Sequence, residues 1–157
     1  MGNRAVIVGT DKKRKSIAIY LHWNGGRDSV EPFLAYAKAK GVRGIDSDNA
    51  YCIARLTQII ANWMGGTLSI GNLVYDPEKD PDYGYIDPGD NGVYVINDQF
   101  EIVDRPNYHY PEQREYKFDE FIYEINERQP KEEQLTSEQL ENIIKEHAYK
   151  VVEEESK

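Results

Sequence analysis

Adjacent glycines at Gly25 and Gly26 separate an apolar segment from the start of a predicted helix. Glycine lets the backbone turn sharply there, and the first turn of a helix leaves N–H groups unpaired, which suits an anionic ligand. Arg27 comes next, and its planar, permanently charged guanidinium can bind a phosphate through several N–H groups. We expect Ser29 to cap the helix, because Pro32 then falls in the first turn, where its missing N–H is no loss. The stretch predicts either a phosphate-binding turn or a structural turn with a surface arginine.

Two further arginines are candidates for the same chemistry. Arg55 lies in a row of polar residues on one face of a predicted helix, and that row has fewer Lys and Glu than a merely solvated face. Arg105 follows Asp104 at a predicted strand end beside an aromatic cluster, where the pair is either functional or a surface ion pair. Arginines and aromatic rings together can hold a phosphorylated nucleotide without transforming it. The aromatic residues available for stacking are Trp23, Tyr85, Tyr94 and Tyr108.

Residue groupings typical of catalysis are missing from the sequence. The histidines His22, His109 and His147 are scattered, and none has a carboxylate or cysteine at metal-ligand spacing. No nucleophile elbow, Walker phosphate loop or dinucleotide fingerprint occurs. The acidic stretch 76–82 lacks the glycine and terminal glutamate of a helix-loop-helix calcium site. We therefore expect no catalytic residue, no metal and no cofactor.

Alternating apolar residues predict the strands that must position these side chains. Residues 4–9 and 16–23 predict one hairpin, 67–75 another strand, and 91–96 with 100–104 a second hairpin. Residues 76–90 are rich in Pro, Gly and Asp and predict a long loop. Long ordered loops in compact domains are often functional.

Apolar residues at helical spacing predict four helices. One follows the glycine turn and stops near Gly41, a second runs from residues 46–48 to about 64, and a third lies around 118–125. The last begins at a capping box, Thr136 with Gln139, and carries an apolar stripe that must be buried in its own domain or in a partner subunit. The predicted fold is therefore α+β: antiparallel β-hairpins form a sheet, helices pack against it, and a helical segment ends the chain.

Length and charge narrow the function classes. The chain of 157 residues has a net charge of −9 and suits one domain, with an α+β core at 1–111 and an acidic helical extension at 112–157. The extension holds 14 Asp and Glu against 7 Lys and Arg, a net charge of −7. An acidic chain repels nucleic-acid backbones, which argues against DNA or RNA polymers as partners. With a single cysteine, no membrane-spanning stretch and no signal peptide, we expect a cytoplasmic protein.

Several blocks of the sequence resemble one known family. Met1 to Ile7, Tyr20 to Val30, Ala54 to Leu56, Asp90 to Gly92 and Ile102 to Arg105 together are similar to the phage anti-Thoeris signal sponges, the first-described family of Thoeris anti-defence proteins. The resemblance runs from the N-terminus to about Tyr110. It implies a protein of the infected bacterial cell that sequesters cyclic ADP-ribose isomers made by TIR proteins, without cleaving them. It also implies homo-oligomers built from dimers, and in some members a separate site for cyclic oligonucleotides of the CBASS defence.

The resemblance assigns roles to individual residues. It implies that Arg27, Arg55 and Arg105 bind the pyrophosphate and that Asn91 binds ribose or base. Trp23 and Asp104 complete the candidate site, the stacking aromatic is Tyr83 or Tyr85, and a second site would use Thr67 or Ser69. If the arginines are ligand contacts, we expect alanine at Arg27 or Arg105 to weaken binding and hardly change folding.

Two other functions compete with the sponge. Asn24 to Ser29 is similar to the pyrophosphate-binding loop of ATP-pyrophosphatase-type enzymes, but that fold needs repeated strand-helix-strand units, which the sequence does not predict. A third hypothesis is an inhibitor that blocks a protein partner with its acidic helices. In that case, deletion from Glu112 onward should spare small-molecule binding.

Overall fold

Five strands form one mixed sheet in the computed structural model, which describes residues 2–112 and 116–155. The strand order is β3-β2-β1-β4-β5, and the predicted hairpins β1–β2 and β4–β5 are both antiparallel. β4 runs parallel to β1, so the expectation of a purely antiparallel sheet is wrong at this one pairing. The chain reaches β4 by crossing from one edge of the sheet to the far side of β1. The strands are β1 (Ala5–Gly9), β2 (Ser16–Leu21), β3 (Ile70–Tyr75), β4 (Val93–Ile96) and β5 (Ile102–Asp104).

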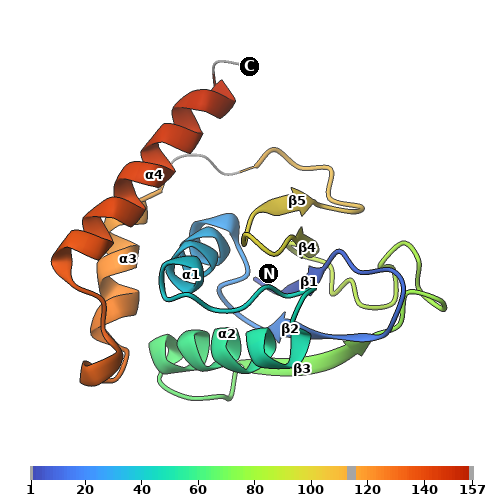
Figure 1. Cartoon of the computed structure of the whole chain (residues 1–157). Helices are drawn as coiled ribbons and strands as arrows, with labels where there is room; N and C mark the ends of the chain where they lie inside the picture. Colours follow the sequence, from blue (N-terminus) through green and yellow to red (C-terminus); the bar gives the residue numbers. More distant parts are fainter. Residues whose placement is uncertain (1, 113–115, 156–157) are drawn as a thin grey trace.

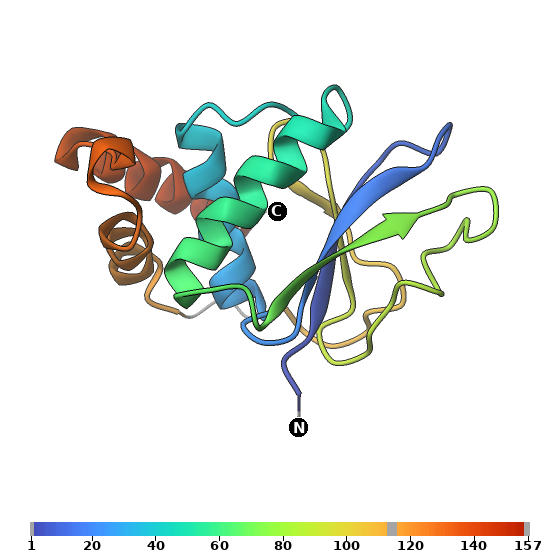
Figure 2. The same cartoon turned by 90° about the horizontal axis from the view of Figure 1, so that it is seen from below.

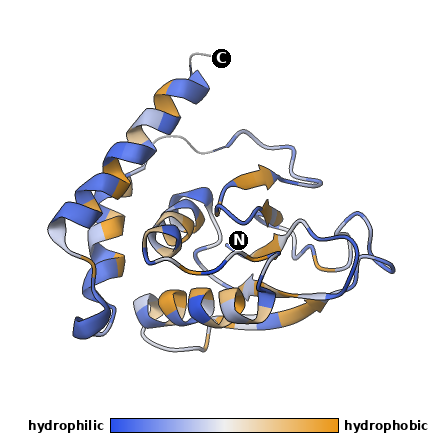
Figure 3. Cartoon of the chain, viewed as in Figure 1, coloured by the Kyte–Doolittle hydropathy of each residue, from blue (hydrophilic) through white to orange (hydrophobic). Residues whose placement is uncertain are grey.

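The helices lie on one side of this sheet (Figure 2), which confirms the α+β class. They are α1 (Arg27–Ala39), α2 (Asn49–Met64), α3 (Phe118–Glu127) and α4 (Ser137–Glu155), with a short 3₁₀ turn at Lys131–Glu133. α1 and α2 lie nearest the sheet, and α3 and α4 lie outside them (Figure 1). The hydrophobic residues concentrate on the strands and the inward faces of α1 and α2, while α4 is mainly hydrophilic (Figure 3). The apolar faces that the spacing predicts are buried for the most part: Val30, Phe33, Leu34 and Ala37 on α1, and Ile53, Leu56, Ile59 and Ile60 on α2. Trp63 and Met64, at the end of the predicted stripe on α2, are only partly buried against the core.

The last two helices belong to the same apolar core as the rest of the chain. Phe118, Ile122 and Ile125 of α3 and Leu140 and Ile143 of α4 are buried in one cluster with side chains of β1, α1 and α2. Residues from α3 onward therefore form part of the core and are not a separate appendage. The C-terminal part of α4 is more exposed, and Val152 at the end of the predicted stripe is 65% exposed.

The long loop 76–92 covers the face of the sheet that no helix covers. Tyr83 of this loop stacks on Tyr75 at 4.7 Å, and both belong to a second apolar cluster with residues of β1, β2 and β4. Lys12 bonds the Tyr75 hydroxyl at 2.7 Å and lies 3.6 Å from the Tyr83 ring centre, so it ties the first hairpin to the loop. The loop thus has a structural task, the closure of a second small core.

Helix α1 begins three residues earlier than predicted, and its cap is Gly26 rather than Ser29. Ser29 is buried, only 3% exposed, and is the third residue of the helix. The physical reason lies at Gly25, where a Cβ would stand 2.7 Å from the Asn3 carbonyl oxygen. Gly25 thus packs closely against the N-terminal segment, and the chain turns there, before Ser29. Pro32 therefore lies inside the helix. Among the described residues, no side chain caps this end of α1.

The start of α4 follows its sequence signature. The Gln139 amide donates to Thr136 Oγ1 at 3.2 Å, and the Thr136 amide donates to Gln139 Oε1 at 2.9 Å, which confirms the capping box. Within the described part of the chain, no helix combines the length and apolar composition needed to cross a membrane.

Candidate anion-binding site

Arg27 and Arg105 meet on opposite oxygens of a single carboxylate. Glu112 Oε2 lies 3.6 Å from Arg27 Nη1, and Glu112 Oε1 accepts a hydrogen bond from Arg105 Nη1. The side chains of Arg27 and Arg105 are only 12% and 10% exposed, and that of Glu112 is 21% exposed. Two guanidiniums are therefore held around one anion position, one from the first residue of α1 and one from the residue after β5.

Arg105 is enclosed by a cage of tyrosine rings and backbone carbonyls. Its guanidinium carbon lies 3.7 Å from the centre of the Tyr94 ring and 4.0 Å from that of Tyr108. Its Nε donates to the Val93 carbonyl at 3.2 Å, and its Nη2 donates to the Asn91 carbonyl. Because the planar guanidinium of Arg105 lies between two rings and donates hydrogen bonds in its own plane, its orientation is fixed. Arg105 is thereby aimed at Glu112.

Tyr94 connects this cage to the glycine turn. Its hydroxyl donates to the Gly25 carbonyl at 2.8 Å, which links β4 to the start of α1. Burial raises the pKa of the Tyr94 hydroxyl, although the nearby Arg105 charge acts against this shift. The hydroxyl is therefore protonated at neutral pH and can donate its hydrogen bond. The relative position of Arg105 and Arg27 is thus set through a buried hydrogen bond.

Arg27 has a second acidic partner one turn along its own helix. Its Nε lies 3.1 Å from Glu31 Oε2, and the Tyr116 hydroxyl donates to the same oxygen. Burial acts to raise the pKa of Glu31, but the Tyr116 hydroxyl and the Arg27 charge outweigh it and hold that pKa below its usual value. Glu31 therefore remains ionised and keeps Arg27 in place.

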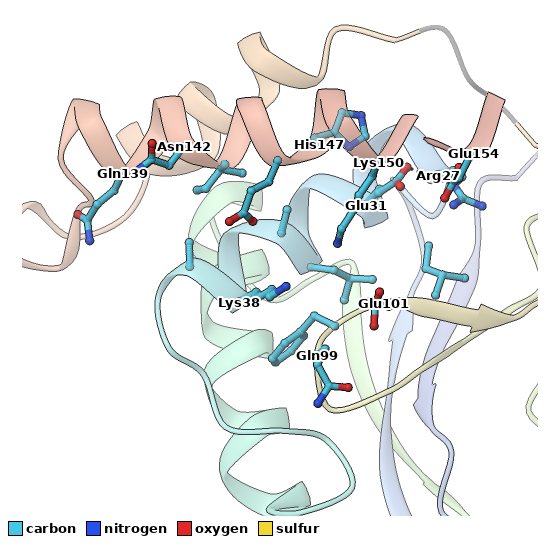
Figure 4. Close-up of a pocket in the computed structure, with 17 residues that line it drawn as sticks. Arg27, Glu31, Lys38, Gln99, Glu101, Gln139, Asn142, His147, Lys150 and Glu154 are labelled. Atoms are coloured by element: carbon cyan, nitrogen blue, oxygen red, sulfur yellow. Dashed lines mark hydrogen bonds and ion pairs between the residues drawn. The ribbon is translucent and has the colours of Figure 1, made fainter. Parts of the chain in front are cut away.

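A groove of about 370 Å³ adjoins Arg27 (Figure 4). It runs between α1 and α4 and ends against the segment that leads into β5. Its volume falls in the range of about 300–1,000 Å³ typical of small-molecule sites. Apolar side chains such as Leu34, Ile102 and Ile143 lie within it, and charged and amide groups surround them. The polar lining consists of Arg27, Glu31 and Lys38 of α1, Gln99 and Glu101 before β5, and Gln139, Asn142, Glu146, His147, Lys150 and Glu154 of α4.

Three other predicted site residues lie around Arg105 or the glycine turn. Asn91 contributes its carbonyl to Arg105, but its side-chain amide donates to Asn3 Oδ1 at 2.6 Å. The Asp104 carboxylate accepts a hydrogen bond from the backbone amide of Arg105 at 2.8 Å. The structure shows this contact in place of one with the Arg105 guanidinium. Trp23, just before the glycine turn, is 48% exposed and packs edge-to-face on His22.

The remaining predicted residues lie elsewhere on this chain. Arg55 lies over the ring of Tyr51 at 4.8 Å, on the exposed face of α2, and shares no contact with Arg27 or Arg105 within the described residues. Tyr85 is 87% exposed on the long loop, whereas Tyr83 is buried against Tyr75 and is not available to stack on a ligand. Thr67 and Ser69 lie in the segment between α2 and β3, where the Ser69 carbonyl accepts the His22 amide at 2.9 Å.

The sequence reasoning did not find Glu112, Glu31 or Tyr116. The spacing of Arg27 and Glu31, four residues apart on one helix, is a signal that was available. Glu112 had no such signal, because its contact with Arg27 joins segments far apart in the chain. Among the residues that the structure describes, no group of three or more His, Cys, Asp or Glu could hold a metal ion.

Searches with protein-family models, curated proteins and solved structures returned no match to this chain. The sequence blocks and the geometry above therefore carry the functional argument.

His147 makes the stability of this region depend on pH. Its ring stacks on Phe118 at 3.6 Å, and burial lowers the pKa of His147, although Glu31 and Glu154 act against the shift. The unfolded chain then binds a proton more readily than the native one, so stability is fully present above about pH 6.5 and falls as the pH drops below it. We expect the urea midpoint to fall between about pH 7.5 and pH 5.5, and His147→Gln to flatten this slope. Exposed His109, replaced by Gln, is the control, and equal slopes for His147→Gln and wild type would contradict the prediction.

Proposed function

We propose that this chain is a phage-type immune-evasion protein that binds a cyclic ADP-ribose isomer and releases it chemically unchanged. One observation carries the proposal: Arg27 and Arg105, nearly buried and distant in sequence, pair with the two oxygens of one carboxylate. Two phosphate oxygens of a pyrophosphate suit the same pair of guanidiniums, since Arg binds phosphate and carboxylate through the same planar N–H fork.

The adjoining groove provides room for the rest of such a ligand. Arg27 borders both the anion position and the groove, so a nucleotide anchored by its phosphates can extend along α1. Amide side chains at the far end of the groove, including Gln99 and Asn142, suit the polar edge of a base, and carboxylates suit ribose hydroxyls. The apolar residues between them suit the faces of the rings.

Binding without turnover follows from the groups at the anion position. A guanidinium does not give up its proton in proteins, and the Tyr94 hydroxyl is protonated at neutral pH like any phenol, with its pKa raised further by burial. The two arginines and Tyr94 attract a phosphate but supply neither a base nor a nucleophile, and the carboxylates of Glu31 and Glu112 are held in ion pairs with these arginines. The enzyme alternative depends on Asp28 and Ser29; Ser29 is buried, which argues against that alternative, and Asp28 is partly exposed.

The proposal extends to an oligomer built from dimers. Arg55, with Tyr51 and Arg43 stacked beside it, and the exposed Tyr85 lie on surfaces from which they can reach a ligand only if a second copy of the chain presents them. A cyclic oligonucleotide at Thr67 or Ser69 would be a second, separate ligand. The place of action would be the cytoplasm of the infected bacterial cell.

Isothermal titration with a panel of cyclic ADP-ribose isomers tests the proposal. We expect tight binding of at least one isomer, and chromatography after heat release should return that isomer intact. Arg14→Ala is a control for loss of positive charge, because the Arg14 side chain is 72% exposed and pairs with Asp11 in the turn between β1 and β2, away from the site. Native mass spectrometry of the protein co-expressed with an active TIR protein gives the subunit number and the ligand mass. Lack of binding, or recovery of a hydrolysed product, would overturn the proposal.

A further inference from the structure

We infer that Glu112 is a built-in competitor of the ligand: it fills the anion position in the empty protomer and must leave before a phosphate binds. The inference rests on the proposed function. It adds a residue that sets the affinity of the site and gives that residue a role opposite to that of the arginines around it.

The bonds of the two arginines leave Glu112 as the exchangeable partner. Arg105 Nε and Nη2 are committed to backbone carbonyls of the β4 region, and Arg27 Nε is committed to Glu31. The Nη1 atoms of both arginines face Glu112. A phosphate that bridges the Nη1 atoms of both arginines must therefore take the place of the Glu112 carboxylate, since Arg105 Nε and Nη2 and Arg27 Nε already bond other groups of the fold.

The location of Glu112 makes such a replacement feasible. It lies in neither a helix nor a strand, between the end of β5 and the start of α3. Its departure breaks no sheet or helix hydrogen bond. The carboxylate is also more exposed than either arginine, at 21% against 12% and 10%, so it can move into solvent while they stay in place.

Competition has a signature that simple electrostatic repulsion lacks. Each ligand that uses the anion position must first displace the same carboxylate. Removal of Glu112 should therefore raise the affinity for all such ligands by one common factor. Long-range repulsion from a glutamate would instead favour the more highly charged ligand, because Coulomb energy scales with the charge of each partner. The two explanations are therefore separable with two ligands of different charge.

The experiment measures affinity for two probes by isothermal titration: the cyclic ADP-ribose isomer that binds wild type most tightly, and inorganic pyrophosphate, which is more highly charged. We expect Glu112→Gln to raise the affinity for both probes by about tenfold. The reason is that the protein without ligand loses one hydrogen bond between charged groups, which the ligand no longer has to break. Glu112→Asp keeps the charge but is one methylene shorter, so it cannot bridge both arginines and should also tighten both probes. Glu124→Gln, which removes a carboxylate paired with Arg128 on α3, should leave both affinities unchanged.

Thermal unfolding of the empty protein provides a second readout. Glu112→Gln should lower the melting temperature without ligand and raise affinity with ligand, a combination that a purely structural glutamate does not give. If wild type binds and both Glu112 variants bind equally or more weakly, the inference is overturned and the proposed function stands. If Glu112→Asp has no effect and Glu112→Gln favours pyrophosphate, repulsion replaces competition. If neither wild type nor the Glu112 variants bind any probe, the proposed function fails as well.

Discussion

Arg105→Ala is expected to remove ligand binding and to destabilise the protein by roughly 3–5 kcal/mol, the range for breaking a buried charge pair. The substitution leaves the Asn91 and Val93 carbonyls without their donor and empties the space between two tyrosine rings. Glu112 would also lose its closer arginine. We therefore do not expect folding to stay nearly unchanged in Arg105→Ala, because the Arg105 side chain is part of the packing.

Chemical denaturation and titration together measure these two effects. Affinity should fall by about 2–5 kcal/mol in the fraction that remains folded, as for the loss of a desolvated charge contact. Arg14→Ala, in the turn between β1 and β2, should change stability by less than about 0.5 kcal/mol, because the Arg14 side chain is 72% exposed. If folded Arg105→Ala binds with wild-type affinity, Arg105 is a structural residue and the proposed site is misplaced. Unchanged stability would instead mean that the cage contributes nothing to folding.

Deletion of residues 112–157 is expected to abolish cooperative folding. The deletion removes five buried apolar side chains, those of Phe118, Ile122, Ile125, Leu140 and Ile143, from the common core. At about 1.5–3 kcal/mol each, their burial contributes roughly 7–15 kcal/mol, an upper bound that matches the whole stability of about 5–15 kcal/mol of a typical domain. The hypothesis that small-molecule binding survives this deletion is therefore not expected to hold.

Circular dichroism and thermal unfolding of the shortened chain give the measurement. We expect no cooperative transition at 25 °C and above, together with exposed apolar surface detectable by dye binding. A chain that lacks only residues 152–157 is the matched control, since Val152 is largely exposed and the core residues of α4 are kept. A cooperative transition in the long deletion would show that residues 1–111 fold alone.

Acidic side chains on α3 and α4 bear on the third hypothesis. The buried stripe of each helix faces the core, and the acidic residues lie outside it, with Glu146 and Glu154 lining the groove between α1 and α4. A protein partner would meet that outer surface without access to the apolar stripe, apart from the exposed end of α4 near Val152. Unless a basic partner binds them, the acidic residues on the outer faces of α3 and α4 serve to keep these faces hydrated.

Local patterns in the sequence were enough to predict most of the elements. The apolar faces of α1 and α2, the two hairpins and the capping box at Thr136 depend on residues within a few positions of one another. Such periodicities are written directly into the chain, because side chains alternate along a strand and recur every three to four residues on a helix. The choice of Arg27 and Arg105 as candidate residues came from the same local reading, a glycine turn in one case and a strand end in the other.

Tertiary structure decided everything that joins distant segments. The parallel pairing of β1 with β4, the start of α1 at the Gly25 turn and the placement of Arg55 away from the other arginines depend on contacts across the fold. The contacts of Glu112 depend on the fold as well, because its carboxylate pairs with Arg27 of α1 and with Arg105 at the end of β5. A sequence shows which side chains can bind an anion, but the partner that each one meets depends on how the sheet and helices close around it. Arginine types and local turns were therefore predictable for this protein, and the pair formed by Arg27 and Arg105 was determined by the fold.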